Sequence, residues 1–258
     1  MPHSFNFSEQ LVLITGGGRG LGEHLVRAFL REGAKVIINY YKSAEAAEKL
    51  AAEAPPEQAL AVQADVTDTH AVKAMFIKAR DHFGCPVTTV VNNALPDFSF
   101  NGDARANADQ LTWANLNQQF EGVVGGALNT TQAALAGMRE TGFGRIVNVG
   151  TNLFQNPVVA YHDYTAAKAA LLSLTRTLSN DLGPDNITVN MISGGLLRTT
   201  DASAATPEAV FELIAQSTPL RRVTTPAEFA DAALFFASPW ARSVTGQNLV
   251  VDGGLVKN

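Results

Sequence analysis

A tyrosine and a lysine four residues apart, Tyr164 and Lys168, have a spacing that can support acid–base chemistry. They lie in the stretch YHDYTAAK, at the head of an alanine- and leucine-rich run that predicts a helix. Residues four apart share one face of a helix, so the ammonium can lie near the phenol. At an effective dielectric constant of about 20, a cation about 4 Å away favours the phenolate by about 4 kcal/mol, whereas burial opposes ionisation. We predict a pKa of Tyr164 lowered toward neutrality, so that the phenol exchanges a proton with a carbonyl or an alcohol.

Tyr161 is the alternative in the same stretch. It precedes Lys168 by seven residues, so it reaches the same face only if the helix begins early, and then from almost two turns away. Tyr164 is therefore the candidate. By itself a Tyr-x-x-x-Lys pattern is common by chance, and a packed tyrosine with a solvated lysine is its ordinary explanation. The chemical interpretation needs support from the rest of the chain.

A glycine-rich segment, TGGGRGLG at 15–22, directly follows the first predicted strand and opens a helix. Gly16, Gly20 and Gly22 let the backbone turn tightly and approach a pyrophosphate, and the start of the helix offers unpaired N–H groups and a positive dipole end. The alternative is a purely structural glycine turn. The position between a strand and a helix is the context that the dinucleotide fingerprint requires, so we predict dinucleotide binding.

The residues after the second predicted strand indicate NADP(H) rather than NAD(H). An NAD site usually has Asp or Glu there, to accept hydrogen bonds from the ribose hydroxyls, but this chain reads NYYKS at 39–43. No carboxylate in that segment repels a 2′-phosphate, and Arg19 with Lys42 and Ser43 can contact it through charge-assisted hydrogen bonds. The alternative is that Arg19 and Lys42 are ordinary surface cations.

The pattern of elements predicts the fold. Short runs rich in valine and isoleucine alternate with longer runs of helical period, as in a parallel sheet with crossover helices. We expect one doubly wound, Rossmann-type α/β domain over 1–258, with a short lid-like insertion at about 196–219. The polar segment at 96–110 is long for a connection beside a strand end, which favours a functional loop over a surface embellishment. The seven predicted strands, flanked by helices on both faces, are 11–15, 34–39, 59–65, 88–94, 144–150, 187–193 and 247–253.

Composition argues against several classes of protein. The net charge of −5 has no large block of one sign, so no nucleic-acid partner is expected. The single cysteine, Cys85, excludes an internal disulfide and lacks the companions of a metal or redox motif. The first residues lack a basic segment followed by an apolar core, and no apolar run approaches about 18 residues. We expect a cytoplasmic protein with no metal site and no membrane partner.

Several motifs, taken together and in order, resemble the short-chain dehydrogenase/reductase family, particularly its 3-oxoacyl-[acyl-carrier-protein] reductase-like members. The resemblance spans nearly the whole chain, and the joint order of the motifs makes it highly specific. The motifs are TGGGRGLG at 15–22, AD at 64–65, NNA at 92–94, YTAAK at 164–168 and VTGQNLVVDGG at 244–254.

The resemblance implies roles for individual residues. Tyr164 is the expected acid/base, and Lys168 is expected to grip the nicotinamide ribose and lower the tyrosine pKa. The family's catalytic serine falls on Thr151, which keeps the hydroxyl that polarises a substrate carbonyl. Asp65 is expected to hold the adenine, and Thr199 to bond the carboxamide. The full expected cofactor-binding set is Gly16, Gly18, Arg19, Gly20, Leu21, Gly22, Tyr40, Lys42, Ser43, Asp65, Val66, Asn93, Ala94, Tyr164, Lys168, Gly195, Leu197 and Thr199.

Some positions depart from the family pattern. An asparagine that supports a water-linked proton relay in the family falls near Val123 here. Asn117 and Asn129 are each six residues away, about 240° around a helix, and so face elsewhere. Leu95 replaces the glycine or alanine that usually follows NNA, and Gly194 replaces a proline. These changes indicate an altered site rather than an abolished one.

We therefore predict an NADPH-dependent oxidoreductase that reduces a ketone, 3-oxoacyl-thioester-like or a related carbonyl, to a secondary alcohol. The alternative is a cofactor-binding sensor or assembly subunit with little turnover. The resemblance implies a homotetramer formed through the two long helices, from about Gln110 and Tyr161. Acyl carrier protein stays open as a partner, because Asn180 and Asp185 stand where members that dock it carry basic groups. Apolar residues that line a substrate pocket, or else belong to the core, are Leu95, Phe98, Phe100, Leu153, Phe154, Leu196 and Leu197.

Overall fold

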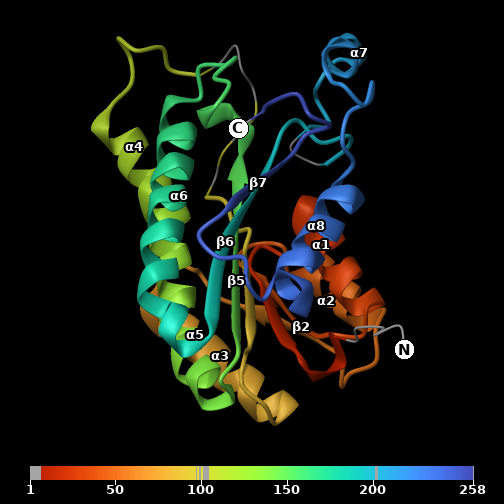
Figure 1. The fold of residues 1–258 in the computed structure, drawn as a ribbon, viewed down its shortest axis with the longest axis vertical. Helices are drawn as coiled ribbons and strands as arrows, with labels where there is room; N and C mark the ends of the chain where they lie inside the picture. Colours follow the sequence, from red (N-terminus) through yellow and green to blue (C-terminus); the bar gives the residue numbers. More distant parts are fainter. Residues whose placement is uncertain (1–6, 97, 99, 101–104, 201–202, 258) are drawn as a thin grey trace.

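A single parallel sheet forms the middle layer of the protein, and helices cover both of its faces (Figure 1). The computed structural model describes residues 7–96, 98, 100, 105–200 and 203–257. The sheet has seven strands in the order β3-β2-β1-β4-β5-β6-β7, which confirms the predicted fold class. Their bounds are β1 Leu11–Ile14, β2 Lys35–Tyr40, β3 Ala59–Gln63, β4 Thr89–Asn92, β5 Gly144–Thr151, β6 Ile187–Gly194 and β7 Asn248–Val251.

The central strands are buried along their whole length, which explains why their sequences read as continuous apolar runs rather than as alternating ones. On one face the core is formed with α1 (Gly20–Arg31), α2 (Ala44–Ala52) and α8 (Pro226–Ala237). On the other face it is formed with α3 (Thr69–Phe83), α5 (Gly126–Thr141) and α6 (His162–Leu182). The sheet order reverses between β1 and β4, and ligands of doubly wound folds bind at the carboxyl ends of strands beside such a point.

The segment before α5 is less regular than the predicted long helix. It begins as α4 (Trp113–Phe120), where Thr112 and Asn115 form a reciprocal capping box, and then passes through the π-helical turn η3 (Glu121–Gly125) into α5. Gly122 in this turn lies against the loop after β4, because a Cβ there would be 2.5 Å from Pro96. The close approach of loop and helix is a tertiary feature that helical periodicity does not contain.

The remaining short elements are 3-10 turns at η1 (Phe7–Glu9), η4 (Asn152–Phe154), η5 (Gly183–Asp185) and η6 (Pro239–Ala241). The predicted lid-like segment contains α7 (Glu208–Ser217), which lies at the upper right of Figure 1; residues 201–202 are outside the described part. Phe211 anchors α7, whereas Leu213 is exposed. Opening and closing of this segment stays a prediction. Within the described ranges, no helix combines the length and apolar character needed to cross a membrane.

Two adjacent phenylalanines on α8 test the described core. Phe236 is 2% exposed and Phe235 is 37% exposed. We expect Phe236→Ala to lower the free energy of unfolding by about 3–5 kcal/mol, because it leaves a cavity between the helix and the sheet. The control, Phe235→Ala, is expected to lower it by about 1 kcal/mol or less. Urea unfolding followed by circular dichroism measures both values, and equal losses would contradict the described packing.

Candidate active site

The glycine-rich segment forms a tight cradle between β1 and α1. Gly16 and Gly20 have φ angles of +62° and +56°, a region that residues with a Cβ rarely adopt. A Cβ on Gly22 would lie 2.0 Å from the carbonyl oxygen of Gly16. The backbone therefore passes closely over itself at the start of α1, where helix N–H groups attract an anion. Binding of a pyrophosphate in this cradle stays a prediction.

Two asparagines hold the cradle in place. The Oδ1 atom of Asn39 accepts from Gly16 N at 3.3 Å, and its Nδ2 donates to Ala64 O at 3.0 Å. The Nδ2 atom of Asn93 donates to Thr15 O at 2.9 Å. Asn39 is 1% exposed, so its amide is a structural link between the cradle and the chain before Asp65. The role of Asn39 was not predicted from the sequence, where the signal for it is a polar side chain inside an apolar strand.

The residues predicted to hold the adenosine half lie around the same edge of the sheet. Ser43 adjoins the cradle, since a Cβ on Gly18 would be 2.9 Å from Ser43 Oγ. Lys42 is exposed and its Nζ atom lies 5.7 Å from the centre of the Tyr41 ring. Asp65 accepts from Thr67 N at 2.9 Å and from Thr67 Oγ1 at 2.7 Å, which shapes the turn after β3.

The NNA segment completes the cradle from the side of β4. The backbone N–H groups of Asn93 and Ala94 both donate to Thr15 Oγ1 at 2.9 Å. Asn92, one residue earlier, is buried and accepts from Thr130 Oγ1 at 2.6 Å. It donates in turn to Asn148 Oδ1 on β5 at 2.9 Å. This buried network connects β4 and β5 to α5, which carries Thr130. It was not predicted from the sequence.

The structure brings together the three predicted catalytic residues. Thr151 is the last residue of β5, and Tyr164 lies in the first turn of α6, which begins at His162. The hydroxyls of Tyr164 and Thr151 form a hydrogen bond. Lys168 follows one turn later on α6, and its Nζ lies 5.8 Å from the centre of the Tyr164 ring. Tyr161 stands before the helix and is therefore not on the face that Tyr164 and Lys168 share.

Burial changes the pKa values of this group in a direction opposite to the one predicted. Desolvation raises the pKa of Tyr164 to about 12, against the hydrogen bond with Thr151, which lowers it. Desolvation also lowers the pKa of Lys168 to about 8. The ammonium does not offset the burial of the phenol, because Nζ donates to the backbone carbonyl of Val149 at 2.6 Å. In the cofactor-free protein, Tyr164 is thus firmly protonated at neutral pH.

Val123, at the position without the family's asparagine, lies beside a small cavity. The cavity has a volume of about 10 Å³, about the space of one water molecule, and Thr15, Asn92 and Lys168 give it polar walls. The two asparagines that lie six residues from Val123 in the sequence bind other groups, as expected. Asn117 donates to Glu121 at 2.8 Å, and Asn129 donates to Val66 O at 2.9 Å.

The three residues predicted to contact the nicotinamide half of the cofactor, Gly195, Leu197 and Thr199, differ in their surroundings. Gly195 adjoins Asn152, whose Nδ2 would be 3.0 Å from a Cβ on Gly195. Asn152 donates to Asp252 at 2.9 Å, so the VDGG motif supports this corner of the site. Thr199 is exposed, whereas the side chain of Leu197 packs into the core under α8 rather than into an open site. Binding of cofactor by Leu197 would therefore involve its backbone.

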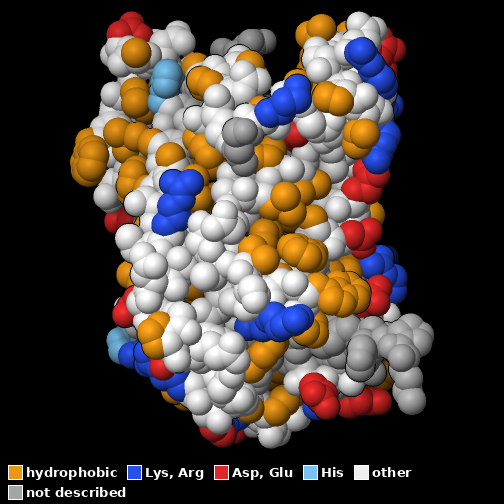
Figure 2. Space-filling model, in the orientation of Figure 1, with side chains coloured by type: hydrophobic (Ala, Val, Ile, Leu, Met, Phe, Trp, Pro, Cys, Tyr) orange, Lys and Arg blue, Asp and Glu red, His pale blue; other side chains and the backbone are white. Residues whose placement is uncertain are grey.

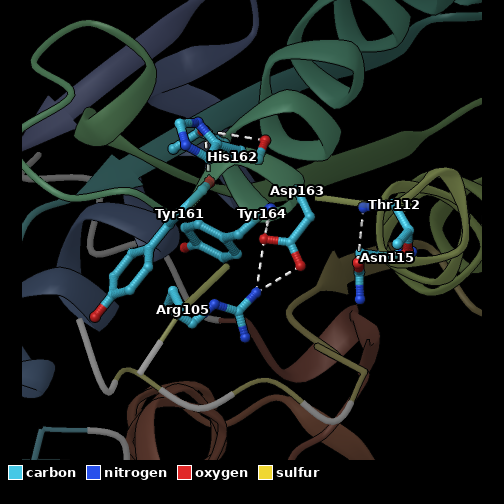
Figure 3. Close-up of polar contacts among 8 residues, drawn as sticks. Arg105, Thr112, Asn115, Tyr161, His162, Asp163 and Tyr164 are labelled. Atoms are coloured by element: carbon cyan, nitrogen blue, oxygen red, sulfur yellow. Dashed lines mark hydrogen bonds and ion pairs between the residues drawn. The ribbon is translucent and has the colours of Figure 1, made fainter. Parts of the chain in front are cut away.

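An aromatic group surrounds Tyr164, formed by Phe98, Phe100 and Tyr161. Beside it, Arg105 forms an ion pair with Asp163 (Figure 3). From the sequence, Phe98 and Phe100 were undecided between pocket and core, and the pairing of Arg105 with Asp163, 58 residues apart, was not predicted.

In the space-filling view, acidic and basic side chains are interspersed, and the upper edge is hollowed between the α6 side and α7 (Figure 2). Among the described residues, no cluster of His, Cys, Asp and Glu side chains suits a metal ion.

Comparison with known proteins finds similarity over nearly the full length. A family model described as enoyl-(acyl carrier protein) reductase matches residues 16–256. The 3alpha-hydroxysteroid dehydrogenase of Mediterraneibacter gnavus is 34% identical over 95% of this chain and 96% of that protein. The 3-oxoacyl-[acyl-carrier-protein] reductase MabA of Mycobacterium tuberculosis is 30% identical over 96% and 94% of the two chains. Versicolorin reductase of Emericella nidulans is 31% identical over 97% of each.

The buried lysine gives a test of the site by pH. The folded pKa of Lys168, about 8, lies below its ordinary value of 10.5, so between these values the unfolded chain binds more protons. Stability from this group therefore rises with pH through the window. We expect the free energy of unfolding of the wild type, minus that of Lys168→Met, to rise by about 2 kcal/mol between pH 8 and pH 9.5. Urea unfolding at several pH values measures the difference, and parallel curves would contradict the burial of a titrating amine.

Proposed function

Because the chain belongs to the short-chain dehydrogenase/reductase family, whose members are oxidoreductases with a nicotinamide cofactor, we propose that it is an NADPH-dependent ketone reductase. The proposed product is a secondary alcohol, and the proposed substrate is a 3-oxoacyl thioester or a related carbonyl compound. The observation that carries the proposal is the hydrogen-bonded pair of Tyr164 and Thr151, with Lys168 one helical turn away, at the same sheet edge as the glycine cradle.

The residues present fit a dinucleotide. A Cβ on Gly22 would collide with the Gly16 carbonyl oxygen, so only glycine lets the backbone turn this tightly at the start of α1, where helix N–H groups attract an anion. We propose that this cradle holds the pyrophosphate, that Asp65 and Val66 hold the adenine side, and that Lys168 bonds the nicotinamide ribose. When bound, the cofactor supplies the hydride that reduces the carbonyl carbon.

Tyr164 is proposed to donate the proton. With a pKa of about 12 the phenol is protonated at neutral pH, which is the form that gives a proton to a carbonyl oxygen as the carbon is reduced. We propose that Thr151 bonds the same oxygen, a role supported by the hydrogen bond between its side chain and Tyr164. Lys168 carries a positive charge at neutral pH and would stabilise the phenolate left behind. Proton donor, carbonyl anchor and cation thus come from two elements, the end of β5 and the first turns of α6.

The preference for NADP(H) is proposed from charge. Arg19 precedes α1 and Lys42 follows β2, and both side chains are exposed at the edge where Ser43 adjoins the cradle. The segment NYYKS at 39–43 contributes no carboxylate there. A 2′-phosphate at this edge would meet two cations, whereas a carboxylate would repel it.

We expect the double substitution Arg19→Ala with Lys42→Ala to weaken NADPH binding at least about tenfold, because charge-assisted hydrogen bonds to a phosphate are each worth roughly 1 kcal/mol or more. Binding of NADH should change less than about twofold, since it lacks the 2′-phosphate. Quenching of protein fluorescence by each cofactor measures the affinities. An exposed pair elsewhere, Arg80→Ala with Lys78→Ala, serves as the control. An equal loss for both cofactors would refute the assignment of the phosphate site.

Assembly and location extend the proposal. The resemblance to the family implies a homotetramer formed through α4, α5 and α6, and Trp113 on α4 is 74% exposed, which leaves an apolar side chain available there. A cytoplasmic location is proposed from the sequence. Acyl carrier protein is left open as a partner, because Asp185, in η5 directly after α6, is acidic and pairs with Arg139 at 2.6 Å.

Loss of NADPH absorbance, with an acetoacetyl thioester and a panel of ketones, tests the reaction. We expect Tyr164→Phe to lower kcat at least about 100-fold with cofactor affinity nearly unchanged, because only the proton donor is removed. Thr151→Ser keeps a hydroxyl and should retain activity within about tenfold, whereas the near-isosteric Thr151→Val should lose at least about tenfold. Equal residual rates in the wild type and Tyr164→Phe would instead favour a cofactor-binding sensor.

A further inference from the structure

Phe98 lies face to face with the proposed proton donor. Its ring centre is 4.8 Å from that of Tyr164, with an angle of 30° between the ring planes. Phe100 meets Tyr164 edge-on at 5.5 Å, and Tyr161 meets Phe98 edge-on at 5.3 Å. Phe98 and Phe100 come from the long segment after β4, whereas the tyrosines come from the start of α6. The aromatic group thus joins two segments at the one side chain that the proposed reaction needs.

Arg105 fixes Phe98 in this position. The guanidinium carbon of Arg105 lies 4.2 Å from the centre of the Phe98 ring. Its Nη2 atom donates to both carboxylate oxygens of Asp163, at 2.6 and 2.5 Å. Asp163 also accepts from the backbone N–H of Tyr164 at 2.9 Å. Figure 3 shows Arg105 and Asp163 facing one another beside the two tyrosine rings.

The exposure of this pair separates it from an ordinary surface ion pair. The side chains of Arg105 and Asp163 are 20% and 8% exposed, whereas those of Arg80 and Glu140 are 55% and 53% exposed. A pair with so little contact with water is screened weakly and holds its partners in one geometry. The guanidinium is planar, so it can stack on a ring and bind a carboxylate at the same time. Arg105 therefore links the ring of Phe98 to the backbone of the helix turn that carries Tyr164.

We infer that Phe98 determines the substrate specificity of this site, with Arg105 as its positioning residue, and that the site prefers ketones carried on a flat ring system. The inference rests on the proposed function. A flat ring near the Tyr164 hydroxyl can pack against the Phe98 ring, and each aromatic contact contributes about 0.5–1.5 kcal/mol beyond the buried area. A saturated ring or an acyl chain buries similar area without this gain. The guanidinium of Arg105 attracts the face of the Phe98 ring, and this attraction depends on its position over that face.

The test compares two ketones with the same fused-ring skeleton, 2-tetralone and 2-decalone, of which only the first has a flat aromatic ring. With NADPH, the wild type should favour 2-tetralone at least about tenfold in kcat/KM, which corresponds to about 1.4 kcal/mol. Phe98→Leu should bring the ratio close to one, mainly through a higher KM for 2-tetralone. The matched control is Phe143→Leu, since Phe143 also lies under an arginine, Arg145, at 4.1 Å, but at the opposite end of β5. The control should keep the wild-type ratio.

Two variants of Arg105 separate positioning from stability. Arg105→Lys keeps a cation opposite Asp163 and should retain most of the preference for 2-tetralone, whereas Arg105→Ala should lose it. A merely structural role would lower the melting temperature and reduce both ketone rates in proportion, with the ratio unchanged. That result would overturn the role of Arg105 as a positioning residue.

A binding experiment distinguishes failure of this inference from failure of the proposed function. Calorimetry on the NADPH-loaded protein compares 2-naphthol with decahydro-2-naphthol, and neither measurement depends on turnover. Tighter binding of 2-naphthol that Phe98→Leu abolishes supports the inference, even if no ketone is reduced and the proposed function fails. Equal binding of the two alcohols by the wild type and by Phe98→Leu would overturn the inference, and reduction of both ketones at equal rates would then leave the proposed function standing.

Discussion

The burial of a phenol and an amine against the end of β5 is the constraint on which the site depends. Tyr164 and Lys168 are 6% and 3% exposed, and each has a pKa shifted toward its neutral form because water is excluded. Such groups are stable inside a protein only when their polar atoms are bonded. The Val149 carbonyl and the Thr151 hydroxyl provide those bonds. A buried strand end beside the first turns of a helix therefore sets the protonation states of Tyr164 and Lys168 as well as their positions.

The same edge of the sheet also carries the glycine cradle, and side-chain amides connect it with the strands beside Tyr164. Asn39 and Asn93 bind the glycine segment, whereas Asn92 and Asn148 connect β4 with β5 below the site. These side chains satisfy backbone groups that a tight turn leaves unpaired. Because Asn39, Asn92 and Asn148 are also buried, the cradle and the strand ends beside Tyr164 are held in a fixed relation. Such preorganisation is what hydride transfer between two bound molecules requires.

The segment after β4 adds side chains to this frame. Its aromatic side chains pack on Tyr164, and the pair of Arg105 and Asp163 attaches it to α6. The relatives are named for acyl, steroid and versicolorin substrates, although each is matched by this chain over 94–97% of its own length. A common frame with changeable segments at the strand ends accounts for that diversity, because segments outside the sheet can change without disturbing the core.

The sequence by itself determined the strands and their parallel arrangement, the glycine-rich turn between β1 and α1, and the shared helical face of Tyr164 and Lys168. These features follow from the periodicity of apolar residues and from the spacing of neighbouring residues, both of which can be read directly from the sequence. Only the tertiary structure decided that burial outweighs the lysine in setting the pKa of Tyr164, that η3 interrupts the helix near Val123, and that Arg105 reaches Asp163. Each of these depends on the distance and the solvent between groups far apart in the chain. Desolvation and ion pairing are set by such distances, and no pattern of neighbouring residues specifies them.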